Sequence, residues 1–581
     1  MAKFPIEEFI EEDVFTDREA ELTFLQTWYR EIAQGKSTSQ ALISPRRLGK
    51  TALLERFVNT VFFNDFGVAP FYYYRGRDTT TLRGFLLNYA TTFFRQYIAY
   101  LLQDPLLYRN PEITLSELAT LKTADQRIKI VQKSIVSFLQ RYENDDLTAM
   151  RMQWEQMVEL PEFIASRTGV NVAIIIDEFQ DLKTQIFNKP EGSKLDPVND
   201  WPIDLTASFS RQSQSKKAPL LVSGSAVTMI FKTVMGGPLG GRFSFFYLKP
   251  MSIADGAELA KRLIDEIDDE LANYLSFQLG GHPYYITCCA KSKAPVRGFA
   301  SRAQIDKLID YEIEKGDIAG FWQTHFQENK ALINQDDDAK LGQKIFYYFT
   351  KYNNQQVQIG EIAKQLRVTN QVVEAKIEKL YQADLVFRQG VRYYAFNDHM
   401  LMRFIRNSYH EGVEGVDAVP FRVRGFDNYY KGQALELLVQ NLFRTFNKEK
   451  LPGELFNVGE EVTVPKFSQV GSIKAKLPAT SEYEIDIYGE YEDGQEKKVW
   501  LTECKYRAQR RLDRQEVERT LQASEVVKEQ YTASSVVVWF ISTAGFTAAA
   551  QKLIAEQGCL SSTRTELNLL ARRYGITTTL D

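Results

Sequence analysis

The sequence predicts an α/β protein of several domains, with a parallel β-sheet in its N-terminal part and a second α/β unit at its C-terminus. Apolar runs rich in β-branched residues, at 41–43 and 172–176, end in small or acidic residues, which is typical of buried parallel strands. Alternating apolar and polar residues at 483–492 and 497–507 predict two strands of another sheet. Because 581 residues exceed what one hydrophobic core sustains, we expect three or four domains.

The composition is that of an ordinary globular protein. Apolar residues at 44% and charged residues at 25% argue against a long disordered segment. The net charge of -4 argues neither for nor against nucleic acid, but the charges are unevenly distributed, with eleven Lys and Arg against five Asp and Glu between Lys340 and Arg406. The four cysteines form no CxxC pair, and no run reaches the ~18 apolar residues that a membrane helix needs. The start MAKFPIEEF does not read as a leader, so we expect a cytoplasmic protein without a membrane partner.

The first strand leads into a loop that is suited to phosphate. The loop SPRRLGKT runs from Ser44 to Thr51, and an amphipathic helix is expected over 52–58. Backbone N–H groups around Gly49 and the start of the helix would cradle phosphates, Lys50 would reach the β- and γ-phosphates, and Thr51 would hold Mg²⁺. Ser44 replaces the first glycine of the usual G-x-x-x-x-G-K-[ST] pattern, which weakens the match without removing a chemical group.

Two further strands are expected to complete this site. The run 172–176 ends in Asp177 and Glu178, which would orient the Mg²⁺ shell and polarise the attacking water. The run 220–225 ends in Ser225, a hydroxyl suited to sensing the γ-phosphate. We therefore predict ATP and Mg²⁺ as cofactors and Glu178 as a catalytic residue. The candidate nucleotide-binding residues are Ser44, Arg46, Arg47, Gly49, Lys50, Thr51, Asp177 and Ser225, with Mg²⁺ on Thr51 and Asp177.

These motifs resemble the archaeal-type ATPases of the AAA+/STAND group. The residues that carry the resemblance are FTDREAEL (15–22), PRRLGKT (45–51), IIIDEFQ (174–180), SGS (223–225), GGR (240–242) and GGHPYYI (280–286), and it extends to about residue 400. The resemblance implies a P-loop NTPase parallel sheet and a helical lid that opens at GGHP. The sequence leaves the oligomeric state open, a homo-oligomer through the ATPase domain being one alternative. The resemblance places 15–19 near the adenine and makes Arg242 a candidate for acting on phosphate, a surface or inter-domain salt bridge being the alternative. The aromatic-rich helical insertion at 75–169 has no assigned role.

The basic middle segment predicts a winged helix-turn-helix. Helices are expected at 340–351, 359–366 and 370–383, followed by extended runs at 385–388 and 391–396. If this module meets DNA, Asn370, Gln371 and Lys376 lie on its third helix, and Arg388 and Arg392 flank the wing. A spacer that contacts other proteins is an equally good interpretation.

The C-terminal part gathers acidic residues with a lysine. A helix over 431–445 carries Glu436, the strand at 483–492 carries Asp486, and the strand at 497–507 carries Glu503 and Lys505. Strict alternation places Glu503 and Lys505 on one face opposite Cys504, and places Ile485 and Ile487 together on the other face from Asp486. Carboxylates are the ligands that Mg²⁺ prefers, and a lysine can stabilise a phosphate undergoing cleavage.

This arrangement resembles the restriction-endonuclease-like PD-(D/E)xK nucleases. The resemblance makes Glu436, Asp486, Glu503 and Lys505 the candidate catalytic residues and Asp486 and Glu503 the ligands of a nuclease Mg²⁺. A helix over 515–528 and a strand over 536–542 would complete an α-β-β-β-α-β core. The proline that often precedes the family's first aspartate is replaced by Ile485. A solvated sheet face, or a silent nuclease fold that only binds, are the alternatives.

We therefore expect four domains: a P-loop ATPase core with its helical insertion (1–250), a helical lid (251–335), a winged helix (336–412) and a nuclease-like domain (413–581). The predicted function is an ATP-dependent switch that controls a metal-dependent nuclease in genome defence or DNA processing. Nucleic acid is the expected partner, with DNA favoured over RNA. The alternative is an ATP-gated regulatory scaffold whose nuclease-like domain is catalytically silent.

Overall fold

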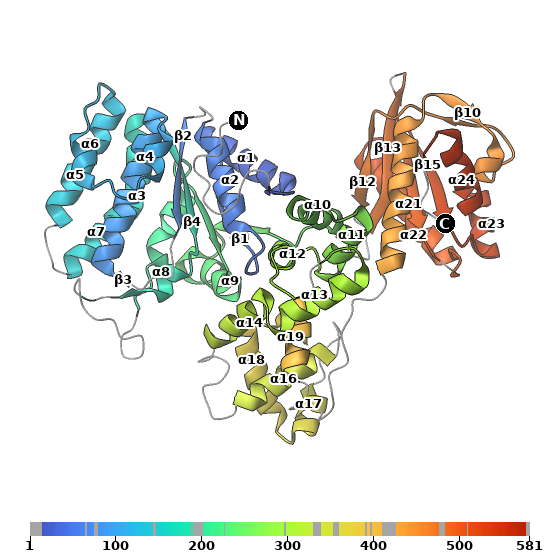
Figure 1. The fold of residues 1–581 in the computed structure, drawn as a ribbon. Helices are drawn as coiled ribbons and strands as arrows, with labels where there is room; N and C mark the ends of the chain where they lie inside the picture. Colours follow the sequence, from blue (N-terminus) through green and yellow to red (C-terminus); the bar gives the residue numbers. More distant parts are fainter. Residues whose placement is uncertain are drawn as a thin grey trace. The chain divides into compact units, whose positions relative to one another are not determined.

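The chain divides into two compact units, Met1–Arg422 and Val423–Asp581 (Figure 1). The computed structural model describes residues 14–63, 67–74, 80–142, 147–187, 189, 202–225, 227–295, 298–328, 339–351, 359–389, 392–394, 398–409, 426–475, 483–494, 496–507 and 509–576. The finer division into four domains stays a prediction.

A five-stranded parallel sheet forms the centre of the first unit. Its strands, in spatial order, are β2 (Val68–Tyr74), β4 (Asn171–Asp177), β6 (Leu220–Gly224), β1 (Ser39–Ile43) and β7 (Phe243–Tyr247). Strand β6 lies between β1 and β4, with Leu42 opposite Ser223 and Ile176 opposite Val222. Because all five strands run in parallel, their carboxyl ends meet at one edge, where ligand sites of such sheets lie. The parallel sheet predicted from the apolar runs is confirmed.

Helices α1 (Glu19–Ala33) and α2 (Lys50–Phe62) pack against each other beside this sheet. Trp28 and Tyr29 of α1 meet Phe57 of α2, with ring centroids 6.4 Å and 6.1 Å apart. Helix α2 begins at Lys50, two residues earlier than the amphipathic pattern predicts, so Lys50 and Thr51 belong to its first turn.

The segment between β2 and β4 is helical, as predicted. It contains β3 (Thr80–Thr81), α3 (Leu82–Leu102), α4 (Pro105–Arg109), α5 (Leu115–Thr120), α6 (Gln126–Tyr142) and α7 (Leu147–Thr168). Helix α3 packs on β2, where the Tyr89 and Phe93 rings meet Phe71 edge to face at 5.2 Å and 5.1 Å. Helices α5 and α6 lie farther from the sheet (Figure 1). The aromatic residues of this segment thus belong to the hydrophobic core that it shares with the sheet.

Short elements connect β4, β6 and β7. They are α8 (Asp181–Thr184), β5 (Ile186–Phe187), η1 (Thr206–Ser210), η2 (Gln212–Gln214), α9 (Val227–Met235) and η3 (Gly237–Leu239). Five helices follow in the segment predicted to be the lid: α10 (Ile253–Leu263), α11 (Asp269–Gln278), α12 (Pro283–Ala290), α13 (Arg302–Glu314) and α14 (Asp317–Glu328). Helix α12 opens at Pro283, as the GGHP motif implies. Gly281 requires a left-handed φ of 66°, and a Cβ there would lie 2.1 Å from the Met251 carbonyl oxygen.

The helices and the hairpin expected of a winged helix are present as α16 (Ala339–Lys351), α17 (Ile359–Leu366), α18 (Asn370–Gln382), the antiparallel pair β8 (Phe387–Gln389) and β9 (Arg392–Tyr394), and α19 (His399–Tyr409). The identity of this segment as a winged helix stays a prediction. Residues 390–391 and 395–396 of the predicted wing lie outside the described residues. Asn370 and Gln371 are exposed, but Lys376 is only 8% exposed because it lies on the inner side of α18 beside Ile377. Burial argues against a phosphate contact by Lys376.

The second unit is a five-stranded sheet in the order β12 (Gln469–Ala475), β13 (Tyr483–Asp493), β14 (Glu496–Lys505), β15 (Ser535–Ser542) and β16 (Leu560–Ser562). Helices α21 (Phe426–Thr445) and α22 (Arg514–Gln530) pack on it, and α23 (Ala548–Glu556) and α24 (Arg564–Arg573) follow. Shorter elements are β10 (Glu449–Leu451), η4 (Gly453–Phe456) and β11 (Val462–Val464). The first three strands are antiparallel and the last two pairings are parallel, which is the α-β-β-β-α-β succession that the sequence predicts.

The prediction that side chains alternate strictly between the two faces along β13 is wrong. The register against β12 shifts between Gly471, which faces Tyr488, and Ile473, which faces Ile485, so β13 carries one extra residue there. Ile485 consequently packs in the cluster with Val527 of α22, whereas Ile487 packs in the cluster with Leu435 of α21. A bulge of this kind re-aims the side chains beside it, and Asp486 is the residue between the two isoleucines.

Among the described residues, no helix is both long and apolar enough to cross a bilayer. The four cysteines are buried free thiols.

Candidate functional sites

The loop before α2 has the backbone that phosphate binding requires. Arg47 and Gly49 both adopt left-handed φ, 65° and 86°, so the loop turns tightly before the first turn of the helix. The buried Arg18 holds this shape, because its Nη2 donates to the Leu48 carbonyl at 3.0 Å and its Nη1 donates to the Lys249 carbonyl at 2.9 Å. The segment that the resemblance places near the adenine thus supports the loop directly.

Lys50 and Thr51 converge with Asp177 at the carboxyl edge of the sheet. The Lys50 ammonium donates to Asp177 Oδ1 at 2.6 Å, and the Thr51 hydroxyl donates to Asp177 Oδ2 at 2.7 Å. Ser223 of the intervening strand β6 donates its hydroxyl to Asp177 Oδ1 at 2.5 Å. The predicted Mg²⁺ ligands are therefore neighbours, and both are hard oxygen donors of the kind Mg²⁺ accepts.

Glu178 lies next to this group and is held in one position. Its backbone has a left-handed φ of 55°. Its Oε1 accepts from Lys50 Nζ at 2.9 Å, and its Oε2 accepts from the Ser225 hydroxyl at 2.9 Å and backbone N–H at 3.1 Å and from Gln180. A strained backbone and a saturated carboxylate are typical of a residue whose position is functionally constrained.

Charge pairing decides the protonation states here. Burial acts to lower the pKa of Lys50, but the adjacent carboxylates of Asp177 and Glu178 outweigh it and raise that pKa. Burial acts to raise the pKa of Glu178, and Lys50 with the hydrogen bonds from Gln180 and Ser225 lowers it overall. Lys50 is therefore cationic and Glu178 anionic near neutral pH, as the chemistry requires.

The other predicted residues of this site have different surroundings. Ser44 is buried, and its hydroxyl donates to the Pro45 carbonyl at 2.9 Å. The Arg47 guanidinium lies over the rings of Tyr284 and Phe321, at 5.0 Å and 5.8 Å, and so connects the loop to the lid. Arg46 is hydrogen bonded through its backbone to His282.

Arg242 contacts a different group of residues. Its guanidinium donates to the Ser210 hydroxyl at 2.6 Å and to the Ser210 carbonyl. Within the described part of the chain, Lys50, Asp177 and Glu178 form no hydrogen bond with Arg242. Its action on phosphate stays a prediction.

The second candidate site is in the C-terminal unit, at the bulge of β13. The Lys505 ammonium lies 2.5 Å from Glu503 Oε1 and 3.6 Å from Asp486 Oδ2. Asp486 Oδ2 also accepts from the Cys504 backbone N–H at 2.7 Å, which fixes the bulged residue to β14. The Cys504 thiol is buried in the core with Leu435, on the side away from Lys505, as predicted.

Carboxyl groups are crowded at this site. Burial and then the charge of Asp486 raise the pKa of Glu436 on α21 to about 7, and the same two causes raise the pKa of Glu503. Burial also raises the pKa of Asp486, against the opposing effect of Lys505. Burial opposes the charged form of Lys505, but Glu503 and Asp486 raise its pKa. Three carboxyls thus share one cation.

This donor set fits a divalent cation that binds oxygen. Asp486 and Glu503 would hold it, and its charge would offset the repulsion that raises the pKa values of the carboxyls. No group of three or more His, Cys, Asp or Glu residues poised to hold a metal occurs among the described residues. Two carboxylates are a usual protein contribution for Mg²⁺, which keeps several waters and binds substrate phosphates.

Three residues at these sites were not predicted from the sequence. Ser223 and Gln180 fix the carboxylates of Asp177 and Glu178, and their signal was present in the SGS and DEFQ motifs that contain them. Tyr483 lies beside the second site: burial and then Glu503 raise its pKa to about 12, and its hydroxyl is 2.9 Å from the Thr520 hydroxyl. Nothing in the local sequence distinguishes Tyr483 from an ordinary strand tyrosine.

Comparison with known proteins gives a family match for the part of the chain that contains the first site. Residues 15–288 match the family model described as an ATPase domain predominantly from Archaea. This part of the chain is an archaeal-type ATPase domain. The ATPase domain contains the whole Lys50, Asp177 and Glu178 cluster and begins at Phe15. No curated protein matches the chain in sequence.

Solved structures give weaker likenesses. A Walker-type ATPase of Pyrococcus abyssi is 14% identical, with a TM-score of 0.41, over 69% of this chain and 99% of that one. The ORC1 protein of Aeropyrum pernix in complex with DNA is 13% identical, with a TM-score of 0.31, over 71% and 97%. A STAND protein of Pyrococcus horikoshii with a tetratricopeptide repeat sensor is 13% identical, with a TM-score of 0.28, over 70% and 45%. With TM-scores below 0.5, these likenesses do not bear on function.

Proposed function

We propose that this protein is an ATP-dependent switch that controls metal-dependent cleavage of nucleic acid, preferably DNA, by its C-terminal unit. The observation that carries the nuclease part is the meeting of Asp486 and Glu503 about Lys505. The ATPase domain supports the switch part.

In the ATPase domain, Lys50 and the first turn of α2 would bind the phosphates of ATP. Thr51 and Asp177 would hold Mg²⁺, and the charge of the bound ion would offset the negative charge of the phosphates. Glu178, anionic and fixed by Ser225, would orient and polarise the attacking water. Since Lys50 pairs with both carboxylates here, nucleotide binding would exchange these ion pairs for contacts with phosphate.

In the C-terminal unit, Asp486 and Glu503 would hold a divalent cation, which activates water and stabilises the phosphate when bound. Lys505 would stabilise the negative charge that develops on the phosphate. Glu436, whose pKa is about 7, would share a proton with the site near neutral pH.

A continuous set of contacts supports coupling within the first unit. Arg47 of the phosphate loop stacks on Tyr284 at the start of α12. The next residue, Tyr285, donates its hydroxyl to Asp398 Oδ2 at 2.7 Å, and Asp398 in turn accepts from the first backbone N–H groups of α19. A change at the loop would thereby reach α19, the last described helix before the C-terminal unit.

A cleavage assay tests the nuclease. Plasmid, linear duplex, single-stranded DNA and RNA are incubated with Mg²⁺ or Mn²⁺, with and without ATP. Asp486→Ala and Lys505→Ala should each stop cleavage while ATP turnover survives, because each removes one member of the cluster. Asp493→Ala and Lys498→Ala are matched controls, since these residues form an exposed ion pair of 2.7 Å elsewhere on the same two strands. Intact substrates in every condition would refute the nuclease.

One observation favours the scaffold alternative: the ammonium of Lys505 already neutralises Glu503, as in a site that needs no metal. In that case the nucleotide state would govern binding of a partner, and the wild-type protein would leave DNA and RNA intact with either metal. Equal results for Asp486→Ala and Asp493→Ala would support the scaffold.

A further inference from the structure

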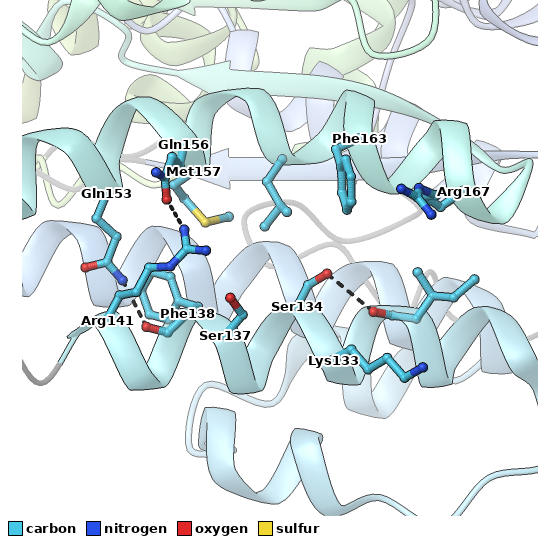
Figure 2. Close-up of a pocket in the computed structure, with 12 residues that line it drawn as sticks. Lys133, Ser134, Ser137, Phe138, Arg141, Gln153, Gln156, Met157, Phe163 and Arg167 are labelled. Carbon is cyan, nitrogen blue, oxygen red and sulfur yellow. Dashed lines mark hydrogen bonds between the residues drawn. The ribbon is translucent and has the colours of Figure 1, made fainter.

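Helices α6 and α7 form a groove that the ATPase chemistry does not use. They run antiparallel, and side chains from both point into the space between them (Figure 2). The cavity has a volume of about 490 Å³. Its lining extends from Gln153 to Arg167 along α7, which corresponds to about 21 Å of helix.

The floor of the groove is apolar. Phe138 of α6 and Met157 of α7 are buried in it, and Leu160 is half-buried. The polar groups deeper in the groove are satisfied internally, because Gln153 donates to the Phe138 carbonyl at 3.0 Å and Ser134 donates to the Ile130 carbonyl at 3.3 Å. The floor therefore offers apolar contact and few unmet hydrogen bonds.

The rim of the groove is cationic. Lys133, Arg141 and Arg167 line it, and no carboxylate does. Arg141 donates to the neutral Gln156, and the Arg167 guanidinium lies 5.2 Å from the centre of the Phe163 ring. None of these three cations forms an ion pair with any residue that the structure describes. Phe163 is 49% exposed, an apolar ring at the mouth of the groove.

We propose that this groove is the docking site of an acidic amphipathic helix from a partner protein. An elongated, solvent-open channel between two helices suits a third helix, which presents apolar residues at i, i+3, i+4 and i+7 to the floor. Glu and Asp flanking that stripe would meet Lys133, Arg141 and Arg167, whose charges have no counterpart in the groove. About 21 Å of groove would accommodate about four turns of such a helix.

The probe is a fluorescein-labelled helical peptide of about 18 residues with a leucine stripe flanked by glutamates, and anisotropy is measured with the full-length protein. A second peptide carries lysines in place of the glutamates. The acidic peptide should bind with a Kd near ~10 μM, more weakly at high salt, and the lysine peptide should not bind.

Charge reversal is the decisive variant. Lys133→Glu with Arg167→Glu should weaken the acidic peptide at least about tenfold and allow the lysine peptide to bind. Phe163→Ser should also weaken the acidic peptide, whereas Leu106→Ser, at a 79% exposed position of α4 outside the groove, should have no effect. All four substitutions are at exposed positions, and unchanged thermal melting and ATP turnover would confirm intact folding.

Four outcomes overturn the proposal. They are no saturable binding of the acidic peptide up to ~100 μM, equal binding of both peptides, an affinity that charge reversal leaves unchanged, and saturable binding of oleate in place of the peptide. Sedimentation velocity tests a fifth outcome that would overturn the proposal. If the protein self-associates and charge reversal abolishes this self-association, the occupant of the groove is a second copy of this chain.

Discussion

Protonation of His282 should destabilise the lid. This imidazole is 7% exposed between Gly281 and Pro283, and it stacks on the Tyr285 ring with centroids 4.0 Å apart. Burial, followed by the nearby charge of Arg18, lowers its pKa to about 3, against the opposing effect of its hydrogen bond with the Arg46 backbone. The folded protein therefore keeps His282 neutral over the physiological range.

The size of the effect follows from the pKa difference. An exposed histidine has a pKa of about 6.5, so below that pH His282 is protonated in the unfolded segment but stays neutral in the folded one. The stability is fully present above about pH 6.5 and is lost progressively as pH falls toward the folded pKa of about 3. At about 1.4 kcal/mol for each pH unit, the loss at pH 5 is about 2 kcal/mol.

Hydrogen exchange of α12, measured by mass spectrometry from pH 5 to pH 8, gives the free energy of local opening after correction for intrinsic rates. His282→Gln removes the titrating group and serves as the reference. The wild-type value minus the variant value should fall by about 2 kcal/mol between pH 7 and pH 5. A difference that stays constant to within about 0.5 kcal/mol would refute the neutral, buried state of His282.

Three more variants test the ATPase domain. Lys50→Ala should weaken ATP binding by about 2–3 kcal/mol, or roughly 30- to 150-fold, in titration calorimetry, because a buried cation is lost beside two carboxylates; unchanged affinity contradicts the phosphate role. Glu178→Gln should slow single-turnover hydrolysis by about 10²–10⁴ with affinity nearly intact, and a loss of affinity like that of Lys50→Ala would exclude water activation. Gly281→Ala should destabilise the ATPase domain by about 1–3 kcal/mol in urea unfolding, since its Cβ would meet the Met251 carbonyl; a neutral result would contradict the left-handed turn.

The sequence predicted the elements whose signals are local. The three strands that end at Ser44, Asp177 and Ser225 were recognisable because a parallel strand buried on both faces is continuously apolar, and their polar ends then had to meet at one edge of the sheet. The helices and the hairpin of the predicted winged helix were recognisable from helix spacing and from the basic residues of the hairpin. These features depend on residues within about one element of each other.

Features that depend on distant partners were not predictable. Arg47 looks like a phosphate ligand in its loop, but its partners Tyr284 and Phe321 come from the lid, more than two hundred residues away. Arg242 bonds to Ser210, in a short 3-10 helix that leaves no periodic signal. Lys376 is a residue type that is usually exposed, yet the packing of α18 buries it.

The extra residue in β13 has a consequence for recognising proteins of this kind by their sequences. Any alignment that matches this strand to an unbulged one must open a gap of one position, and the gap falls beside Asp486. An alignment without that gap matches the residues on one side of Asp486 to positions whose side chains lie on the opposite face of the sheet. Deleting one residue of the bulge would therefore disturb the carboxyl cluster, and relatives are best sought with a profile that permits an insertion there.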